Sequence, residues 1–583
     1  MTRLKVLLLA CALVPEESIR AQVPPAGPTD VVEPALRALP IAQLPSMQVD
    51  AAGIAPSGRR LWSIEPIGTD PSRQRLVLVG GLDGNPQSTA AVMRVLQWWF
   101  TDREAAVLRN GWEIAAVPCA RPDSCASGVA SDSTVPPTFP PVGGFFDGKL
   151  DPTPHYLWRW ATMQAPTIVV EIRVGWPLQW EANPLATSLV DDPVPAPAGS
   201  LIAALGSSGT GAAWSAPVPA VQLTARVNAV TDALRDLMDR SAGAISPLRT
   251  SLAGRGGRPA LDVARLIARR YPVQPIMSYI PALSWSGSLR LARMSGDEQY
   301  RSKAIDEMTP FLTGVTPAIA EPYLLTSLAG HLAFADWGTL LGNADADRLA
   351  QKAAEFILPQ APGELVRFAR AWTDDMFMAT SVLARVAART GDEQYSIAAG
   401  RLLTAYAADL QRPDGLFVHA REGPHAWGRG NGFAAFGLME ALTYLPAAWP
   451  ERGAVLRSFQ ALMRGMVPQQ AADGMWRQVV DEPGSYREFT VTAMMVAAMA
   501  RGLRLGWIDA SYRPVVDRAW RGLLARIAED GTLIDVCTGT GAGPTKMYYL
   551  NRAGLTGPDD RGGGMALTAA IEMEELARAG ARR

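Results

Sequence analysis

A short turn sequence recurs through the second half of the chain and constrains its fold more than any other feature. Residues 294–300 (MSGDEQY) are nearly repeated at 389–395 (RTGDEQY), and a weaker copy (LGNAD) lies between them at 341–345. Turns of similar shape follow near 445–446 and 505–509. Each turn separates two segments with helical periodicity, and its glycine suits a left-handed helix end while the next acid suits a helix start. The pattern predicts a series of helical hairpins.

The hairpins run from about residue 261 to the end of the chain, where a helix predicted at 563–580 pairs with the first one. A hairpin that buries one face needs neighbours, and either an open solenoid or a closed ring supplies them. Periodicity alone leaves both arrangements open. In either case, residues 261–583 are predicted to form an all-α domain.

The preceding region has a different pattern, in which strands and helices alternate. Residues 76–79, 112–117 and 168–172 are apolar runs typical of buried strands, whereas 88–108 has the periodicity of a helix. This order favours a smaller α/β domain with a mainly parallel sheet, which we place at 58–245.

The segments around these elements have less regular patterns. Residues 23–57 are rich in Pro, Ala and Val and are expected to be a loose lead-in. Residues 192–219 are dense in Pro, Gly, Ala and Ser and are predicted to form a long loop, followed by a closing helix at 221–240. A chain of 583 residues is long enough for two such domains.

Charge and hydropathy exclude some classes of partner. The formal net charge is -1, so no basic excess indicates a nucleic-acid partner, and no apolar run of about 18 residues follows the N-terminus to span a membrane. Residues 1–22 have the charged start, apolar run and small residues of a signal peptide. We therefore expect export to the periplasm or the extracellular space, with a lipid anchor at Cys11 as the alternative.

The chain has four cysteines and four histidines. Cys119 and Cys125 are close enough in sequence to close a small disulfide loop in an oxidising compartment, which leaves Cys537 alone. No Cys/His cluster has metal-ligand spacing, so we predict neither a metal site nor a cofactor.

The first chemically informative segment is 372–378 (WTDDMFM), at the start of a predicted helix. It places two adjacent acids among aromatic and methionine side chains. An apolar, aromatic pocket favours the neutral form of an acid, which suits a proton donor, but an acid at a helix start can equally be an N-cap. Consecutive helical residues point about 100° apart, so one of Asp374 and Asp375 can be the donor and the other the cap.

Two later segments could complete a site. Residues 415–419 (GLFVH) contain the single histidine His419, and 427–433 (WGRGNGF) have glycines at alternate positions that leave room for a ligand. Arg429 offers a planar fork to a carboxylate, and the flanking aromatic rings can stack on a sugar face. A lone histidine and a glycine-rich turn can each also be purely structural.

Together these segments resemble the unsaturated rhamnogalacturonyl hydrolases and the unsaturated glucuronyl hydrolases. The patterns W-x-D-x-x-F-M, G-L-x-x-H and W-x-R-G-N-G-aromatic occur in that family's order and spacing. Residues 474–479, 488–493, 537–540 and 548–549 are similar to its later loops. The resemblance covers about 261–583 and implies an (α/α)6 barrel, in which the ring of hairpins is closed.

The resemblance also assigns roles to single residues. The family's catalytic acid falls on Asp374. Its substrate-binding positions fall on Trp372, Met378, His419, Trp427, Arg429, Asn431 and Phe433, the last of which is usually Trp in the family.

The implied reaction is the release of a terminal 4,5-unsaturated uronic acid from oligosaccharides that a polysaccharide lyase has cut. Protonation of the C4–C5 double bond gives an oxocarbenium-like cation, water adds to it, and the resulting hemiketal opens and breaks the glycosidic bond. One acid that gives a proton and then takes one from water can do most of this, whereas ordinary glycoside hydrolysis needs two carboxylates.

A larger departure from the family lies one hairpin upstream. The family has a second acid shortly before the glycine that corresponds to Gly330, but residues 324–330 (LLTSLAG) contain none, and Glu321 is out of register. This departure puts the second carboxylate in doubt. The alternative function is a non-catalytic carbohydrate-binding or scaffold protein with a degenerate barrel.

Residues 58–245 are similar to zinc carboxypeptidases. Residues 76–85 resemble the strand and turn that carry the H-x-x-E motif of that family, and 169–173 resemble the strand that ends in its last histidine. The three ligand positions hold Asp83, Pro86 and Arg173. Proline and arginine do not bind zinc, so the resemblance implies a metal-free relative with a binding or structural role.

Overall fold

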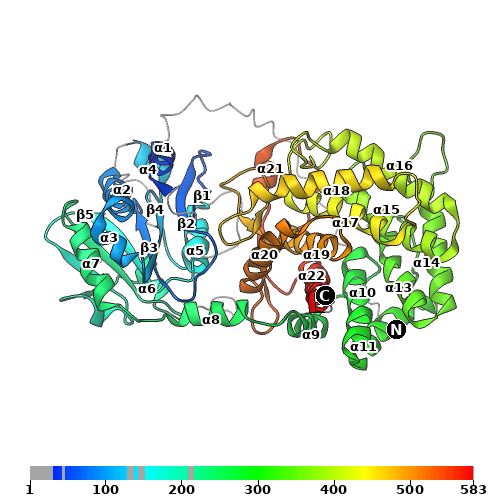
Figure 1. Cartoon of the computed structure of the whole chain (residues 1–583), viewed down its shortest axis with the longest axis horizontal. Helices are drawn as coiled ribbons and strands as arrows, with labels where there is room; N and C mark the ends of the chain where they lie inside the picture. Colours follow the sequence, from blue (N-terminus) through cyan, green and yellow to red (C-terminus); the bar gives the residue numbers. More distant parts are fainter. Residues whose placement is uncertain (1–30, 42–45, 128–136, 142–150, 208–215, 582–583) are drawn as a thin grey trace, which may run out of the picture.

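The computed structural model describes residues 31–41, 46–127, 137–141, 151–207 and 216–581. The expected signal peptide and Cys11 lie outside these ranges. No helix within them is long and apolar enough to cross a membrane. Figure 1 shows two parts side by side, one built around a sheet and the other helical, with the link between them running through α8 (Pro247–Gly256).

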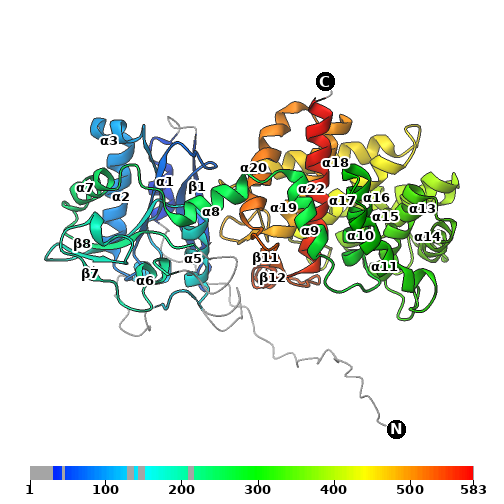
Figure 2. The ribbon, with the colours of Figure 1, turned by 90° about the horizontal axis from the view of Figure 1, so that it is seen from below.

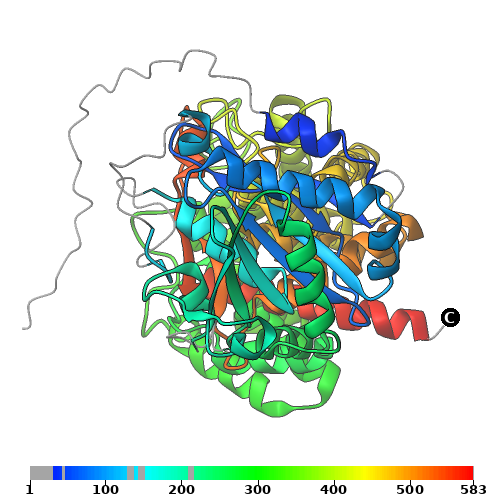
Figure 3. The same ribbon diagram turned by 90° about the vertical axis from the view of Figure 1, so that its left-hand side faces the viewer.

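The N-terminal part is built around an eight-stranded sheet in the order β1-β2-β4-β3-β5-β8-β6-β7; this part faces the viewer in Figure 3. The strands are β1 (Met47–Ile54), β2 (Arg60–Pro66), β3 (Gln74–Gly80), β4 (Trp112–Val117), β5 (Ile168–Val174), β6 (Gln179–Ala182), β7 (Val194–Pro195) and β8 (Ala220–Ala225). The helices before α8 are α1 (Val32–Arg37), α2 (Pro86–Thr101), α3 (Arg103–Leu108), α4 (Pro122–Ser127), α5 (Thr153–Met163), α6 (Leu201–Leu205) and α7 (Val230–Arg240). The central strands β4, β3, β5 and β8 are parallel, as expected for an α/β domain.

Three local predictions in this part were wrong. The helix expected at 221–240 begins only at Val230, because 220–225 form β8, whose buried residues pair in parallel with β5. The helix expected at 88–108 is two helices, since Asp102 ends α2 and caps α3 by accepting a hydrogen bond from the Glu104 amide. The loop expected at 192–219 contains β7 and α6.

The expected lead-in at 23–57 was also wrong in part, because it contains β1. This strand pairs antiparallel with β2 over most of its length and adds an edge to the sheet. The disulfide expected between Cys119 and Cys125 is present, and Cys537 is free and buried.

The helical part is a closed ring of hairpins. Its inner helices are α10 (Tyr279–Ser295), α13 (Leu332–Leu341), α15 (Thr373–Thr390), α17 (Gly428–Tyr444), α19 (Phe489–Leu505) and α22 (Asp560–Ala581). Its outer helices are α9 (Ala260–Arg270), α11 (Glu298–Leu312), α14 (Ala344–Ile357), α16 (Glu393–Leu410), α18 (Arg452–Met466) and α20 (Arg513–Ala525).

Contacts between helices decide between the ring and the solenoid. Each inner helix packs against the next, and α22 returns to α10. The last helix also packs on α9, the first one, as the sequence predicted; Figure 2 shows the two beside each other. Two short sheets lie in the connecting loops, formed by β9 (Trp476–Arg477) with β10 (Arg487–Glu488) and by β11 (Leu533–Cys537) with β12 (Gly554–Gly557).

The recurring turns have the predicted chemistry. Gly296, Gly342 and Gly391 end inner helices with φ of 74°, 73° and 71°, a left-handed conformation that favours glycine. Asp297 and Asp392 then cap the outer helices by accepting hydrogen bonds from backbone amides two residues on. These caps set the hairpins without help from distant residues.

A chain of ion pairs joins the inner helices in their C-terminal halves. We call it the ion-pair belt, and its members in order around the ring are Asp336, Arg385, Glu440, Arg501, Glu572 and Arg290. Ser286, on the same helix as Arg290, donates to Asp336 and closes the circuit. Five members are buried, and Arg290 is partly exposed. The belt occupies one end of the barrel, and the N-terminal ends of the inner helices form the other, which we call the mouth.

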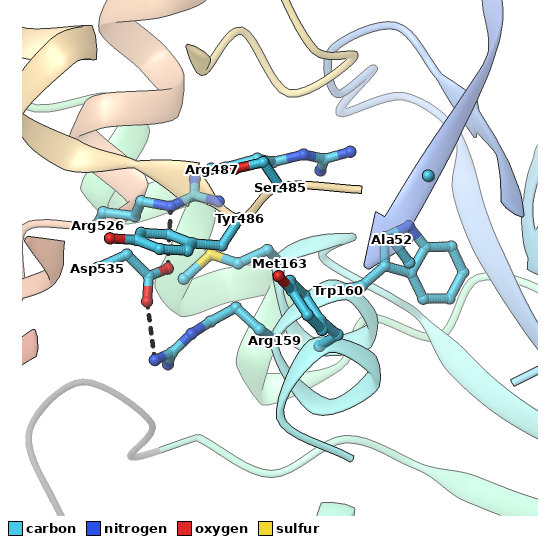
Figure 4. Close-up of a pocket in the computed structure, with 11 residues that line it drawn as sticks. Ala52, Arg159, Trp160, Met163, Ser485, Tyr486, Arg487, Arg526 and Asp535 are labelled. Atoms are coloured by element: carbon cyan, nitrogen blue, oxygen red, sulfur yellow. Dashed lines mark ion pairs between the residues drawn. The ribbon is translucent and has the colours of Figure 1, made fainter. Parts of the chain in front are cut away.

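The two parts of the chain are joined through buried charges. Asp50 on β1 and Glu65 on β2 accept hydrogen bonds from Arg477 on β9 and Arg487 on β10. Beside these pairs lies a cavity of about 20 Å³, where Asp535 forms ion pairs with Arg159 and Arg526 (Figure 4). The ribbon formed by β9 and β10 is therefore held by both parts.

Candidate active site

The mouth of the barrel collects the sequence motifs. Because the inner helices all start there, their positive dipole ends and free backbone amides face the same space. Asp374 is the second residue of α15, and its side chain is 20 % exposed. Among the residues expected to act in the site, it is the carboxylate that solvent can reach.

Asp374 belongs to a hydrogen-bonded chain of three side chains. Nε2 of His419 lies 3.1 Å from Oδ2 of Asp374, and Nδ1 of the same ring lies 2.9 Å from the hydroxyl of Tyr549. His419 is fully buried, so its orientation is fixed. The tyrosine hydroxyl also accepts a hydrogen bond from the Gly543 amide at 3.2 Å. This chain connects the exposed acid to the loop that precedes α21 (Lys546–Leu550).

Asp375 has the capping role that was the alternative for these two acids. Its Oδ2 accepts hydrogen bonds from the amides of Arg370 and Trp372 and from the hydroxyl of Tyr406. The side chain is buried, and this burial raises the pKa of Asp375 to about 6 against the effect of these hydrogen bonds. The two adjacent acids thus divide into an exposed group and a structural one.

The aromatic residues of the motifs lie at different depths. Trp372 is half-buried at the mouth, donates through Nε1 to Glu422 at 2.6 Å, and has the guanidinium of Arg370 over its ring. Trp427 is buried, with its ring centroid 4.5 Å from that of His419. Trp372 is therefore the ring that can meet a sugar directly, while Trp427 supports the histidine.

Phe433 and Met378, which the family resemblance placed among the substrate-binding residues, lie below the surface of the mouth. Both are buried, and Phe433 stacks on Phe377 with centroids 6.1 Å apart and contacts Tyr279 edge-on. In this structure they form the floor beneath the mouth.

The alternate glycines of α17 were expected to leave room for a ligand. In the structure that room is filled by neighbouring protein atoms, so the glycines allow close packing. A Cβ at Gly428 would lie 2.5 Å from the carbonyl oxygen of Arg477, and one at Gly432 would lie 2.5 Å from Sδ of Met494. A Cβ at Gly430 would meet Thr373. The glycines let α17 approach β9, α19 and α15 closely.

Arg429 and Asn431 are engaged by the backbone. The terminal nitrogens of Arg429 donate to the carbonyl oxygens of Cys537 and Thr538, each at 2.6 Å. The Asn431 amide accepts from Phe417 N and donates to two carbonyl oxygens, and both side chains are buried. The fork expected to hold a carboxylate is instead holding a loop at the mouth.

The segment that lacks the second acid is mostly a short helix. Residues 324–330 run through the short helix α12 (Leu325–Leu328), and Glu321 is exposed. His331 follows on the chain, fully buried, and this burial lowers its pKa to about 4. Glu422 also lies beside the motif residues and accepts a hydrogen bond from Nε1 of Trp372.

Two residues at the mouth were missed by the sequence reasoning. Tyr279 begins α10, and Arg561 lies in the first turn of α22, where Gly562 follows it. Tyr279 contacts Phe433 edge-on, and Nη1 of Arg561 lies near Gly539, which follows the Thr538 carbonyl that Arg429 holds. A sequence signal for Arg561 existed: it stands beside glycines at the start of a helix, as Arg429 does.

In the described residues of the N-terminal part, Asp83 and Arg173 are engaged by neighbouring groups. Asp83 accepts hydrogen bonds from Ser88 and the Asn85 amide, and Arg173 pairs with Glu171 at 2.7 Å. Among the residues described, no group of three or more His, Cys, Asp or Glu side chains is placed to hold a metal ion. Asp83 is thus used to begin α2.

Comparisons with known proteins concern the helical part. Residues 265–577, more than half of the chain, match the family model Glycosyl Hydrolase Family 88. The chain is 26 % identical over 196 residues to the unsaturated rhamnogalacturonyl hydrolase YesR of Bacillus subtilis (strain 168), covering 32 % of this chain and 53 % of that protein. It is 25 % identical over 174 residues to the unsaturated 3S-rhamnoglycuronyl hydrolase of Alteromonas sp. (strain LOR), covering 27 % and 42 %. The matches span about half the length of these relatives.

A solved structure is similar in fold. The family 105 glycoside hydrolase of C. acetobutylicum ATCC 824 has a TM-score of 0.50 and 21 % identity, covering 55 % of this chain and 100 % of that one. None of these findings supports the resemblance of residues 58–245 to zinc carboxypeptidases.

Proposed function

The chain belongs to Glycosyl Hydrolase Family 88, and on that premise we propose that it releases a terminal 4,5-unsaturated uronic acid from lyase-generated oligosaccharides. The observation that carries the proposal is the placement of Asp374, partly exposed at the mouth and hydrogen-bonded to the buried His419. The relatives named for unsaturated rhamnogalacturonyl and rhamnoglycuronyl substrates support the same class of sugar.

Asp374 is the proposed acid and then base. The C4–C5 double bond is a vinyl ether, so its electron pair takes the proton of Asp374 at C4 and leaves a cation at C5 that the ring oxygen stabilises. Water adds at C5 and returns a proton to Asp374. The resulting hemiketal opens, and the bond to the leaving sugar breaks. The acid therefore ends the cycle as it began, which is why one carboxyl can suffice.

His419 and Tyr549 position this acid. An ionised carboxylate only accepts hydrogen bonds, so Nε2 of a neutral His419 donates to Asp374, and Nδ1 then accepts from the Tyr549 hydroxyl. Because the tyrosine hydroxyl can donate or accept, the chain can follow Asp374 through both protonation states. Trp372 offers its ring to the sugar, and Arg429 shapes the mouth by holding the 537–538 carbonyls.

Export is part of the proposal and rests on the signal-like pattern of residues 1–22. Lyase products arise outside the cytoplasmic membrane when the polysaccharide is too large to enter. The partners proposed are thus oligosaccharides.

The test is incubation of the full chain with lyase-generated oligosaccharides while the absorbance of the conjugated double bond is followed. Loss of absorbance with release of one sugar unit is expected, and the saturated oligosaccharide is the matched control that should remain intact. The alternative is a degenerate barrel that only binds or scaffolds carbohydrate, and the absence of an acid shortly before Gly330 favours it. It predicts binding of the same oligosaccharide with unchanged absorbance.

A further inference from the structure

The proposed substrate carries a carboxylate, but the arginine expected to receive it is occupied. Both terminal nitrogens of Arg429 already donate to loop carbonyls, and its side chain is only 2 % exposed. A direct contact with a uronate would compete with these bonds. The structure offers a second arginine at the same mouth.

Arg561 lies where it can reach a ligand. Its Nε and one terminal nitrogen pair with Asp559 at 3.1 and 2.5 Å, which fixes the direction of the guanidinium. The other terminal nitrogen, Nη1, donates to no residue in the described ranges and lies about 3.6 Å from where a Cβ on Gly539 would stand. The side chain is 21 % exposed. One edge of this fork is thus held in place and the other is open.

Tyr279 adds a second donor at the mouth, on α10, which packs against the α22 helix that carries Arg561. Its hydroxyl has no hydrogen-bond partner in the part of the chain that the structure describes, while its ring is held by Phe377 and Phe433. Burial raises the pKa of Tyr279 to about 12, so the hydroxyl keeps its proton. The charges of Asp374 and Arg561 both act on this hydroxyl, and the ring lies edge-on to Phe433 at the floor of the mouth, with centroids 5.6 Å apart.

We propose that Arg561 and Tyr279 bind the carboxylate of the terminal uronate. The inference rests on the proposed function and specifies how the site recognises its substrate. With the carboxylate held by Nη1 of Arg561 and the hydroxyl of Tyr279, the sugar ring is directed toward Asp374. The partial positive charge at the start of α22 favours the same anion.

The experiment compares an unsaturated uronate disaccharide with its methyl ester, which keeps the double bond and loses the charge. KM and kcat are measured for the full chain, for Arg561→Met, for Arg561→Lys and for Tyr279→Phe. Arg421→Met is the control, since Arg421 is exposed and its guanidinium is paired with Asp409. Binding of both compounds is measured in parallel by calorimetry in an Asp374→Asn background.

Arg561→Met should raise KM for the acid about 10- to 100-fold, as expected for the loss of a charge-assisted hydrogen bond, and leave the ester nearly unchanged. Arg561→Lys should recover part of the preference and Tyr279→Phe should lose part of it, whereas the control keeps it. An equal acid-to-ester ratio in the wild type and in Arg561→Met would overturn the inference while leaving the hydrolase activity intact. Carboxylate-selective binding without turnover in the wild type would support the inference and overturn the proposed hydrolase activity. If neither compound bound, both the inference and the proposed activity would be overturned.

Discussion

The hydroxyl of Tyr549 lies 2.9 Å from Nδ1 of His419. When Asp374 is ionised it accepts from Nε2 of the same ring, and the Tyr549 hydroxyl stabilises that tautomer by donating to Nδ1. Tyr549→Phe removes the hydroxyl and leaves the ring. We expect kcat to fall about tenfold, which corresponds to one hydrogen bond of about 1.4 kcal/mol, with little change in KM.

The neighbouring Tyr548 is a matched control for this prediction. Its hydroxyl accepts the Gly541 amide, as that of Tyr549 accepts the Gly543 amide, but it does not contact His419. Tyr548→Phe should therefore change kcat less than Tyr549→Phe. Equal losses in the two variants would show that the loop, and not the histidine, limits the rate.

Asp374→Asn tests the acid itself. The amide keeps the size and the hydrogen bond to His419 but has no proton to give, so turnover should fall about 10²–10⁴-fold while substrate binding and the melting temperature are retained. Steady-state kinetics and calorimetry measure both. Asp375→Asn is the comparison, and it should keep turnover near that of the wild type. A larger loss in Asp375→Asn would reverse the assignment of the two acids.

The buried Asp375 should make the free energy of unfolding depend on pH. Its pKa in the folded state is raised from 3.8 to about 6, so between these values the folded protein holds a proton that the unfolded chain has lost. This contribution is fully present below about pH 4 and is lost as pH rises through 6. The free energy of unfolding, measured with urea, should decrease across this window by more in the wild type than in Asp375→Asn. Parallel curves for the two proteins would refute the assignment.

The ion-pair belt should be sensitive to the loss of one member. Arg385 joins Asp336 and Glu440, so Arg385→Met removes one ion-pair partner from each of two buried acids and should cost about 3–5 kcal/mol of stability. Arg389 on the same helix pairs with Asp347 at the surface, and Arg389→Met should cost about 0–1 kcal/mol. Chemical denaturation compares them. Similar losses would mean that the belt contributes no more than a surface pair.

The hairpins could be predicted from sequence because their signals are local. A glycine such as Gly391 and the Asp392 that follows it determine a helix end and a helix start within two residues. Ring closure depends on α22 meeting α9 and α10, contacts between residues about 300 positions apart. The pattern predicted that the last helix pairs with the first, but it left an open solenoid possible, and the family resemblance decided for the ring. The belt left a partial signal: Arg290, Asp336 and Arg385 each stand six positions before a capping glycine.

The site was predicted less completely, for a physical reason. A motif shows which side chains are present. It does not show which other groups of the protein already form hydrogen bonds with them. Arg429 was assigned to a carboxylate because its fork fits one, yet two carbonyls from the 537–538 loop fit it equally well. In the same way β8 was taken for helix, because a short buried run such as 221–225 has no periodicity that distinguishes the two.

The buried charges between the two parts of the chain make each part depend on the other. Asp50 and Glu65 are both acidic and both on the sheet side, while Arg477 and Arg487 are both basic and both on the barrel side. If the two parts were separated, each would carry like charges on a surface that the intact chain covers. The sheet therefore acts as a counter-ion for the barrel, and neutrality of this surface is a property of the whole chain.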